Sequence, residues 1–169
     1  MIVKMIHAAE RNDERGSSYY NDDTKSLLVE PHGGRLVHRE ASADDRVDID
    51  RLPVIEVDTT QLVDCQHFAI GTYSPLMAFM NSETLASVLA ENRLPDGTVW
   101  TLPLVLQLPE ATVKSLGAGA RVLLREAGGE GEAILDVDQV YRLGLEAVAS
   151  QWFGTSSFGH PGVVHFFAA

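Results

Sequence analysis

The chain has 169 residues and a mass of 18.4 kDa, enough for one ordinary domain and too short for two full ones. Hydrophobic residues make up 45% and charged residues 22%, which is typical of a soluble globular protein and excludes a disordered or fibrous chain. The 24 acidic and 13 basic residues give a net charge of −11. This charge argues against binding to nucleic acid or to an anionic membrane surface, because both require clustered Lys and Arg.

The sequence also argues against a membrane span and a secretory signal. The longest nearly apolar stretch, Leu102–Leu108, is far shorter than the roughly 20 residues that a spanning helix needs. The N-terminus has no sustained apolar core followed by a small-residue cleavage site. Cys65 is the single cysteine, so no internal disulfide can form and a reducing compartment is expected. We therefore predict a cytoplasmic protein.

The first third of the chain predicts a polar arm followed by short strands. Residues 1–25 are polar and of mixed charge, and we expect them to form a flexible arm in front of a single domain over residues 26–169. Ser26–Val29 is the first predicted strand, and the Gly-rich run Pro31–His32–Gly33–Gly34 after it predicts a turn. The acidic residues 40–50 predict a surface loop, and the following run, Leu52–Val57, predicts another strand.

Two helices are predicted in the middle of the chain. The first runs from Thr60 to about Ile70, with Asp58 or Thr59 as its N-cap and Gly71 after its end. The second runs from Ser82 to about Asn92, with Asn81 or Ser82 as its N-cap. The predicted buried positions of the two helices are Leu62, Cys65, Gln66 and Ala69 in the first and Leu85, Val88 and Leu89 in the second.

The C-terminal half predicts strands alternating with short helices. The local signal is sharpest for a β-hairpin, in which two apolar segments flank the loop Gly128–Gly129–Glu130–Gly131. The remaining predicted elements are a buried strand over Val99–Leu108, a short helix over Pro109–Leu116, a helix over Leu145–Phe153 that stops at Gly154, and a terminal strand after the turn at His160–Pro161–Gly162. Short strands mixed with short helices, without regular βαβ alternation, favour a single mixed α/β (α+β) domain with a small closed β-barrel and peripheral helices.

Common catalytic and metal-binding patterns are missing from the sequence. The glycine loop at 128–131 lacks the Lys and Ser/Thr of a P-loop and lies between two strands, so it predicts a hairpin turn. The six histidines do not show the spacing of a helical zinc site, and there are no paired cysteines, so we predict neither a metal nor a cofactor. Gly-x-Ser-x-Gly is also absent, and Cys65 on a helix face is more typical of a small core residue than of a nucleophile.

Three turns that each carry a polar side chain are the remaining candidates for a site. They are the turn at His32, the turn Tyr73–Ser74–Pro75 and the turn at His160. In a small barrel the strand ends gather at two rims, so three such turns can share one rim. The residues predicted to line a pocket there are His32, Tyr73, Ser74, Asn81 and His160, with Asn81 expected more strongly as a helix cap. His32 and His160 are the candidate acid–base groups of an enzyme, because histidine suits that chemistry near neutral pH. The alternative is that the turns have a purely structural role and only redirect the chain.

Taken in order, these turns and their flanks resemble a known family. The segments are Pro31–Val37, Gly71–Met80, Leu94–Leu104, Phe153–Thr155 and His160–Val163. Together they resemble the N-terminal PUA-like domain of ATP sulfurylase (sulfate adenylyltransferase), over about Leu28 to Val164. The family has Gly where this chain has Ala78. The resemblance implies a PUA-like fold.

The same resemblance does not carry the family's activity to this chain. ATP sulfurylases join sulfate to the α-phosphate of ATP in a second domain, whose Gln-x-Arg-Asn-Pro and His-x-x-His motifs are both absent from this sequence. We therefore expect a stand-alone binding or accessory module without adenylyltransferase activity of its own, which binds a small molecule or a separate catalytic chain. A homo-oligomer is also compatible with the sequence. The alternatives are a small biosynthetic enzyme that uses His32 or His160, and a fragment of a larger sulfurylase.

Overall fold

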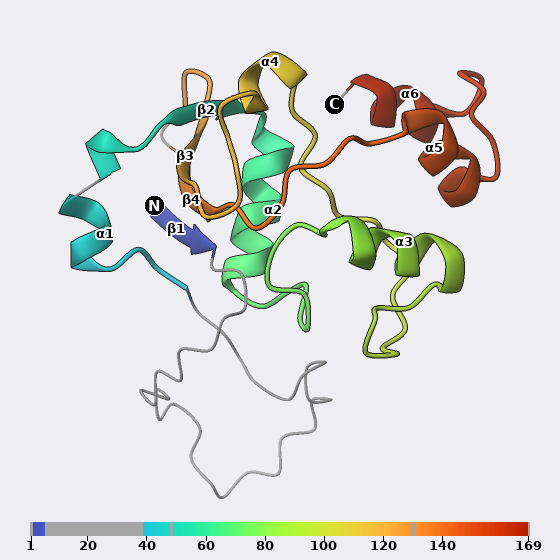
Figure 1. Ribbon diagram of the computed structural model, residues 1–169, viewed down its shortest axis with the longest axis horizontal. Helices are drawn as coiled ribbons and strands as arrows, with labels where there is room; N and C mark the ends of the chain where they lie inside the picture. The colour runs from blue at the N-terminus through green and yellow to red at the C-terminus, as the bar shows by residue number, and fades with distance from the viewer. Residues whose placement is uncertain (1, 6–38, 48, 130, 169) are drawn as a thin grey trace, which may run out of the picture. The chain divides into compact units, whose positions relative to one another are not determined.

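The computed structural model describes residues 2–5, 39–47, 49–129 and 131–168 (Figure 1). Within them the chain forms two compact units. Unit 1 consists of residues 1–78 and 123–135, and unit 2 of residues 79–122 and 136–169. The predicted strand at 26–29 and the turn that contains His32 lie outside the described residues. Each unit is described separately below.

Unit 1 contains most of a four-stranded mixed sheet. The strands are β1 (Ile2–Met5), β2 (Val54–Val57), β3 (Arg121–Glu126) and β4 (Glu132–Asp136), in the order β1-β4-β3-β2. β1 pairs in parallel with β4, and β2 pairs in parallel with β3. Among the described strands β1 and β2 form two open edges, so a mixed α/β fold is confirmed and the predicted closed barrel is not.

Two of the predicted strand features of unit 1 are confirmed. β2 lies inside the predicted strand at 52–57, and the hairpin of β3 and β4 turns through the glycine loop. Gly128 adopts φ +74°, a conformation that glycine accepts at little cost, and the Glu126 N–H donates to Gly131 O at 3.3 Å across the turn. β1 lies at the start of the segment predicted as a flexible arm, while the arm's boundary at residue 25 lies outside the described residues and stays a prediction.

The core of the sheet explains why β3 has no alternating pattern. Val122, Leu123 and Leu124 are consecutive and each at most 1% exposed, so both faces of β3 are covered. Leu123 packs with Ile134 of β4 and with Ala41 from the segment before α1. Consecutive apolar residues in β3 are therefore a consequence of burial on both sides.

The long helix of unit 1, α2 (Thr59–Ala69), begins and ends as predicted. The Asp58 side chain accepts a hydrogen bond from Gln61 N, and the Gln61 side chain accepts one from the Asp58 N–H, which makes a capping box. The helix packs beside β1. Its buried residues are Leu62, Cys65, Phe68 and Ala69. The predicted buried position Gln66 is exposed, because the face turned to the core passes through Phe68 instead.

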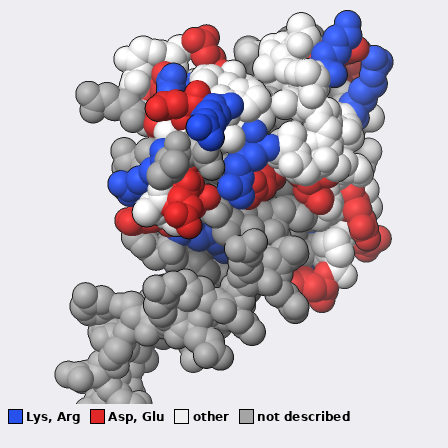
Figure 2. Space-filling model, turned by 60° about the vertical axis from the view of Figure 1, so that its left-hand side comes forward, with Lys and Arg blue, Asp and Glu red and all other residues white. Residues whose placement is uncertain are grey.

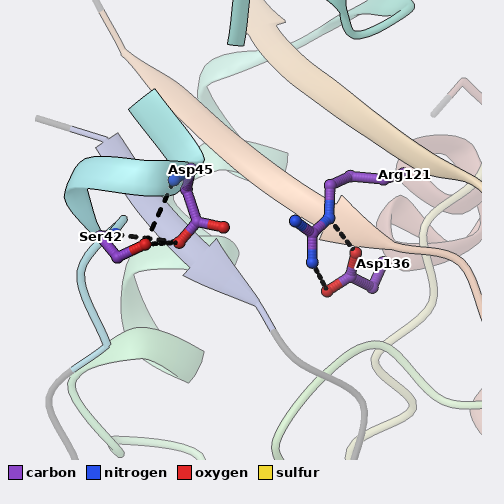
Figure 3. Close-up of polar contacts among 4 residues, drawn as sticks. All are labelled: Ser42, Asp45, Arg121 and Asp136. Carbon is purple, nitrogen blue, oxygen red and sulfur yellow. Dashed lines mark hydrogen bonds and ion pairs between the residues drawn. The ribbon is translucent and has the colours of Figure 1, made fainter. Parts of the chain in front are cut away.

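The prediction that the acidic residues 40–50 form a surface loop is wrong in part. It forms α1 (Ala43–Val47), and a 3₁₀ turn at Ile49–Arg51 follows. Ser42 and Asp45 start α1 as a reciprocal cap: the Ser42 N–H donates to Asp45 Oδ2 at 2.9 Å and the Asp45 N–H to Ser42 Oγ at 3.2 Å (Figure 3). The Ser-x-x-Asp pattern was the local signal for this helix.

Unit 2 is built from four helices and extended segments. The helices are α3 (Ser82–Glu91), α4 (Glu110–Val113), α5 (Leu145–Phe153) and α6 (Pro161–Ala168). α3 and α5 confirm the predicted helices, and Gly154 ends α5 with φ +72°. α4 is shorter than predicted and starts after Pro109. α5 packs against both α6 and α3 (Figure 1).

Two strand predictions in unit 2 are wrong. The predicted strand at Val99–Leu108 does not form: Val99 makes an isolated bridge to Arg93, residues 100–109 have no regular secondary structure, and the Met80 N–H donates to Leu104 O at 2.8 Å. Pro103 and Pro109 lack the N–H that a sheet ladder requires, which disfavours a strand here. The predicted terminal strand is α6, a helix with Pro161 at its first position, where the missing N–H costs nothing.

Candidate functional site

The predicted site residues lie in different parts of the structure. Tyr73 and Ser74 belong to unit 1, Asn81 and His160 belong to unit 2, and His32 lies outside the described residues. The convergence of the three turns on one rim therefore stays a prediction. The surroundings of the four described residues can be examined one by one.

Tyr73 lies in a turn after α2 and faces back onto that helix. Its hydroxyl donates to Asp64 Oδ1 at 2.7 Å, and its ring contacts the rings of His67 and Phe68, both at 5.1 Å between centroids. Burial, together with the hydrogen bond and charge of Asp64, raises the pKa of Tyr73 to about 12. Tyr73 therefore keeps its proton near neutral pH and holds the turn on α2, rather than acting as a base.

The turn itself is held by backbone hydrogen bonds around Ser74. The Ser74 N–H donates to Gly71 O at 3.0 Å, and the Leu76 N–H donates to Tyr73 O at 2.8 Å. Gly71 has φ +77°, which allows the sharp change of direction after α2. The Ser74–Pro75 peptide bond is cis. Ala78, where the related family has Gly, is buried and has no positive φ, so its methyl group fits without backbone strain.

Two residues near the C-terminal end of α2 were missed by the sequence reasoning. His67 has a buried Nδ1 without a hydrogen-bond partner among the described atoms, and it lies one turn after Asp64 on α2. Arg39 donates to the last carbonyls of α2, from its backbone to Ala69 O at 3.0 Å and from Nη1 to Phe68 O at 2.7 Å. This side chain neutralises the helix C-terminus, and burial lowers its pKa. The spacing of Asp64 and His67, three residues apart on one helix, was the signal in the sequence that could have pointed to His67.

Asn81 is the N-cap of α3, as expected. Its Oδ1 accepts a hydrogen bond from the Thr84 N–H at 2.9 Å, and its backbone is extended with φ −74° and ψ 175°. The neighbouring Ser82 N–H donates to Gln139 Oε1 at 2.9 Å. Two of the free N–H groups at the start of α3 are therefore satisfied by side chains. The side-chain oxygen of Asn81, Oδ1, is therefore already engaged as the helix cap.

His160 lies at the start of α6 against an aromatic cluster. Its ring is 5.2 Å from that of Phe153, and its carbonyl accepts from the Val163 and Val164 N–H groups. A Cβ on Gly162 would lie 2.9 Å from the Phe153 ring and 3.2 Å from His160 Nδ1, so glycine is needed for this close packing. His160 Nδ1 is buried and has no hydrogen-bond partner among the described atoms. Only Nε2 remains for contact with a ligand.

Charges of both signs are interspersed on the face shown in Figure 2. Several arginines pair with carboxylates. Arg121 makes two hydrogen bonds to Asp136, at 2.5 and 3.0 Å (Figure 3), while Arg125 pairs with Glu132 and Arg142 with Glu110. A basic site for phosphate or nucleic acid would need unpaired guanidinium groups close together.

The described residues also offer no metal site and no membrane span. Among them, no three His, Cys, Asp or Glu residues come together in a way that could hold a metal ion. No helix in the described part of the chain is long and apolar enough to cross a membrane.

Comparisons with known proteins define the class of this fold. A family model described as PUA-like domain matches residues 29–169, so the chain belongs to the PUA-like domain family. Within that family it is similar to one part of longer proteins named sulfate adenylyltransferase or bifunctional SAT/APS kinase. It is 36% identical over 144 residues to a probable bifunctional SAT/APS kinase 2 of Sorangium cellulosum, and 34% identical over 139 residues to a sulfate adenylyltransferase of Nostoc punctiforme. This confirms the resemblance to the ATP sulfurylase PUA-like domain.

The chain spans only about a quarter to a third of those relatives. The matches cover 82% and 80% of this chain, but 24% of the Sorangium and 36% of the Nostoc protein. A solved structure titled hexameric APS kinase from Thiobacillus denitrificans is similar in fold, with a TM-score of 0.59 and 30% identity. That match covers 69% of this chain and 24% of the other.

Proposed function

We propose that this chain is an accessory module of sulfate activation, which acts in the cytoplasm together with a separate catalytic chain and has no sulfate adenylyltransferase activity of its own. The observation that carries the proposal is the partial match. About four-fifths of this chain aligns with sulfate adenylyltransferases, yet it covers only 24–36% of them. The Gln-x-Arg-Asn-Pro and His-x-x-His motifs that the resemblance leads us to expect in the catalytic domain are absent from the sequence.

The surroundings of the described residues support a module without its own transferase chemistry. Adenylyl transfer places negative charge on phosphate oxygens, and catalysis requires preorganised cations or N–H donors aimed at them. Arg121, Arg125 and Arg142 are paired with carboxylates, and Arg39 caps α2. The net charge of −11 adds repulsion for a polyphosphate substrate.

The negative part of this proposal is tested by an activity measurement on the full chain. Pyrophosphate release from ATP is followed with and without sulfate, and the Nostoc sulfate adenylyltransferase serves as the active control. We expect release no faster than in a sample without protein. Sulfate-dependent release by the isolated chain would show that it is a sulfurylase, and the accessory role would be wrong.

The positive part is tested by complementation. The Nostoc sulfate adenylyltransferase is prepared without the region that this chain matches, and the chain is added to it. A gain in sulfate-dependent pyrophosphate release, or co-elution of the two chains, would support the accessory role. Two chains that neither co-elute nor affect each other's activity would contradict it.

A second candidate function rests on the imidazole of His160. A buried ring nitrogen without a partner is uncommon and needs an explanation, and an acid–base role in a small enzyme with His32 or His160 is one. The ligand would be a small molecule that contacts the imidazole of His160. The variants His32→Ala and His160→Ala distinguish an enzymatic role of the two histidines from a purely structural role of their turns. Folded variants that have lost a ligand or product favour the enzyme, whereas unfolding of both favours structural turns.

A further inference from the structure

The last helix of unit 2 is apolar on both sides. Its inner face is buried, with Val163 fully covered and Phe166 only 6% exposed, and Phe166 contacts the rings of Trp152 and Phe153 on α5. Its outer face carries Val164, which is 45% exposed. Apart from the exposed His165, the side chains of α6 are apolar, and a helix with so much apolar surface is normally buried on more than one side. α6 therefore has one face whose exposure to water is unexplained by its own unit.

Three apolar side chains around that face form one patch, which we name the α6 face: the exposed Phe158 and Val164 and the half-buried Phe167. Phe158 is 64% exposed, and its ring packs edge-on against Phe167 at 5.1 Å between centroids. Val164 and Phe167 are three residues apart on α6, so they lie on the same side of the helix. Isolated exposed apolar residues are ordinary, but a contiguous group that includes two aromatic rings marks an interaction surface.

The segment around the α6 face carries no formal charge. Residues 147–169 contain no Asp, Glu, Lys or Arg, although such residues make up 22% of the chain. All 24 acidic and 13 basic residues, and hence the entire net charge of −11, lie before residue 147. The C-terminal segment is thus the longest stretch of the sequence without formal charge, and it adds nothing to the repulsion between two copies.

We propose that the α6 face binds the α6 face of a second copy of this chain and forms a two-fold symmetric dimer. In such a contact each residue near the axis lies opposite its own counterpart, so a charged residue would face a like charge. An uncharged aromatic patch in a strongly acidic chain avoids such repulsion between like charges. A basic partner, in contrast, would bind more favourably to the acidic part of the surface. The dimer does not depend on the accessory role proposed above.

The test measures the oligomeric state of the full-length protein by sedimentation velocity and light scattering across the micromolar range. We expect the wild type to dimerise. Phe158→Ser removes an aromatic ring from a loop without adding charge, and Val164→Glu places like charges opposite each other. Both should raise the dissociation constant at least about tenfold. Val99→Glu is the matched control, because Val99 is 59% exposed in the same unit but outside the α6 face, and it should leave the dimer intact.

Circular dichroism of each variant establishes that it is folded, and Phe158→Ser remains informative if Val164→Glu is not. A wild type that stays monomeric over the whole range would overturn the proposal, and the face would then be open to a different chain. A dimer that both variants leave unchanged would place the interface elsewhere and overturn it equally. Dissociation by Val99→Glu to the same extent would show that added charge alone breaks the dimer, which also contradicts a specific α6 face.

Discussion

Replacing Asn81 by alanine tests whether this residue is a helix cap or a ligand-binding group. In the structure its Oδ1 accepts the Thr84 N–H at 2.9 Å, and no other side chain is seen to satisfy that N–H. Alanine removes the acceptor, which typically costs about 1 kcal/mol of stability for an N-cap of this kind. For a chain of this size that loss corresponds to a decrease of about 2–4 °C in the melting temperature.

Two further variants define what the cap contributes. Asn81→Asp keeps the acceptor and adds a negative charge at the N-terminus of α3, so stability should match the wild type or exceed it by up to about 0.5 kcal/mol. Gln139→Ala removes the partner of the neighbouring Ser82 N–H. Both groups are exposed and water can replace the bond, so the loss should stay below about 0.5 kcal/mol.

The assay is urea denaturation followed by circular dichroism, together with hydrogen exchange of the first turn of α3. Faster exchange at Thr84 in Asn81→Ala, restored in Asn81→Asp, would locate the effect at the cap. If Asn81→Ala is as stable as the wild type and exchanges no faster, the reasoning from cap geometry is refuted. Asn81 would then be available for the ligand role predicted from the sequence.

Three other predictions follow from the same structure. The pKa of Tyr73 is raised to about 12 from an ordinary value of 10, so its contribution to stability is complete below pH 10 and is lost as the pH rises toward 12. Burial also raises the pKa of Tyr141 to about 12, so ultraviolet titration should show two tyrosines ionising near pH 12 in the wild type and one in Tyr73→Phe; an unchanged amplitude near pH 12 in that variant would contradict the Asp64 contact. Cys65 is fully buried and its pKa is raised to about 12, so a thiol reagent at neutral pH should label it only after denaturation in urea; rapid labelling of the native protein would mean that α2 opens readily. The net charge of −11 predicts no useful binding to RNA or DNA at physiological salt; micromolar, salt-sensitive binding in a polarisation assay would disprove it.

Local signals in the sequence were sufficient wherever a few neighbouring residues decide the structure. Asp58 and Asn81 cap α2 and α3, and Gly154 ends α5, because each satisfies or releases backbone groups within one turn of itself. The hairpin around Gly128 was predictable for the same reason, since its turn depends on residues that can adopt positive φ. The family resemblance rested on such turns and was confirmed by the comparisons.

The tertiary structure decided the segments whose local preferences are ambiguous. The apolar run of α6, with its β-branched and aromatic residues, has the composition of a strand, and a run this short cannot be separated from a buried helix by periodicity. As a helix it buries Val163 and Phe166, which are three residues apart on one side, and Phe166 contacts the rings of Trp152 and Phe153 on α5. The segment at 100–109 has the opposite outcome, since a strand requires a neighbouring strand and its prolines cannot complete a ladder.

The candidate site shows the same division. The sequence by itself determined that the chain is acidic, carries a single cysteine and has a polar residue at each of three turns. It did not determine what those residues contact, because their partners come from elsewhere: Tyr73 is held by Asp64, and His160 packs on Phe153. Contacts of this kind depend on how elements pack, and packing is a property of the whole fold rather than of a short segment.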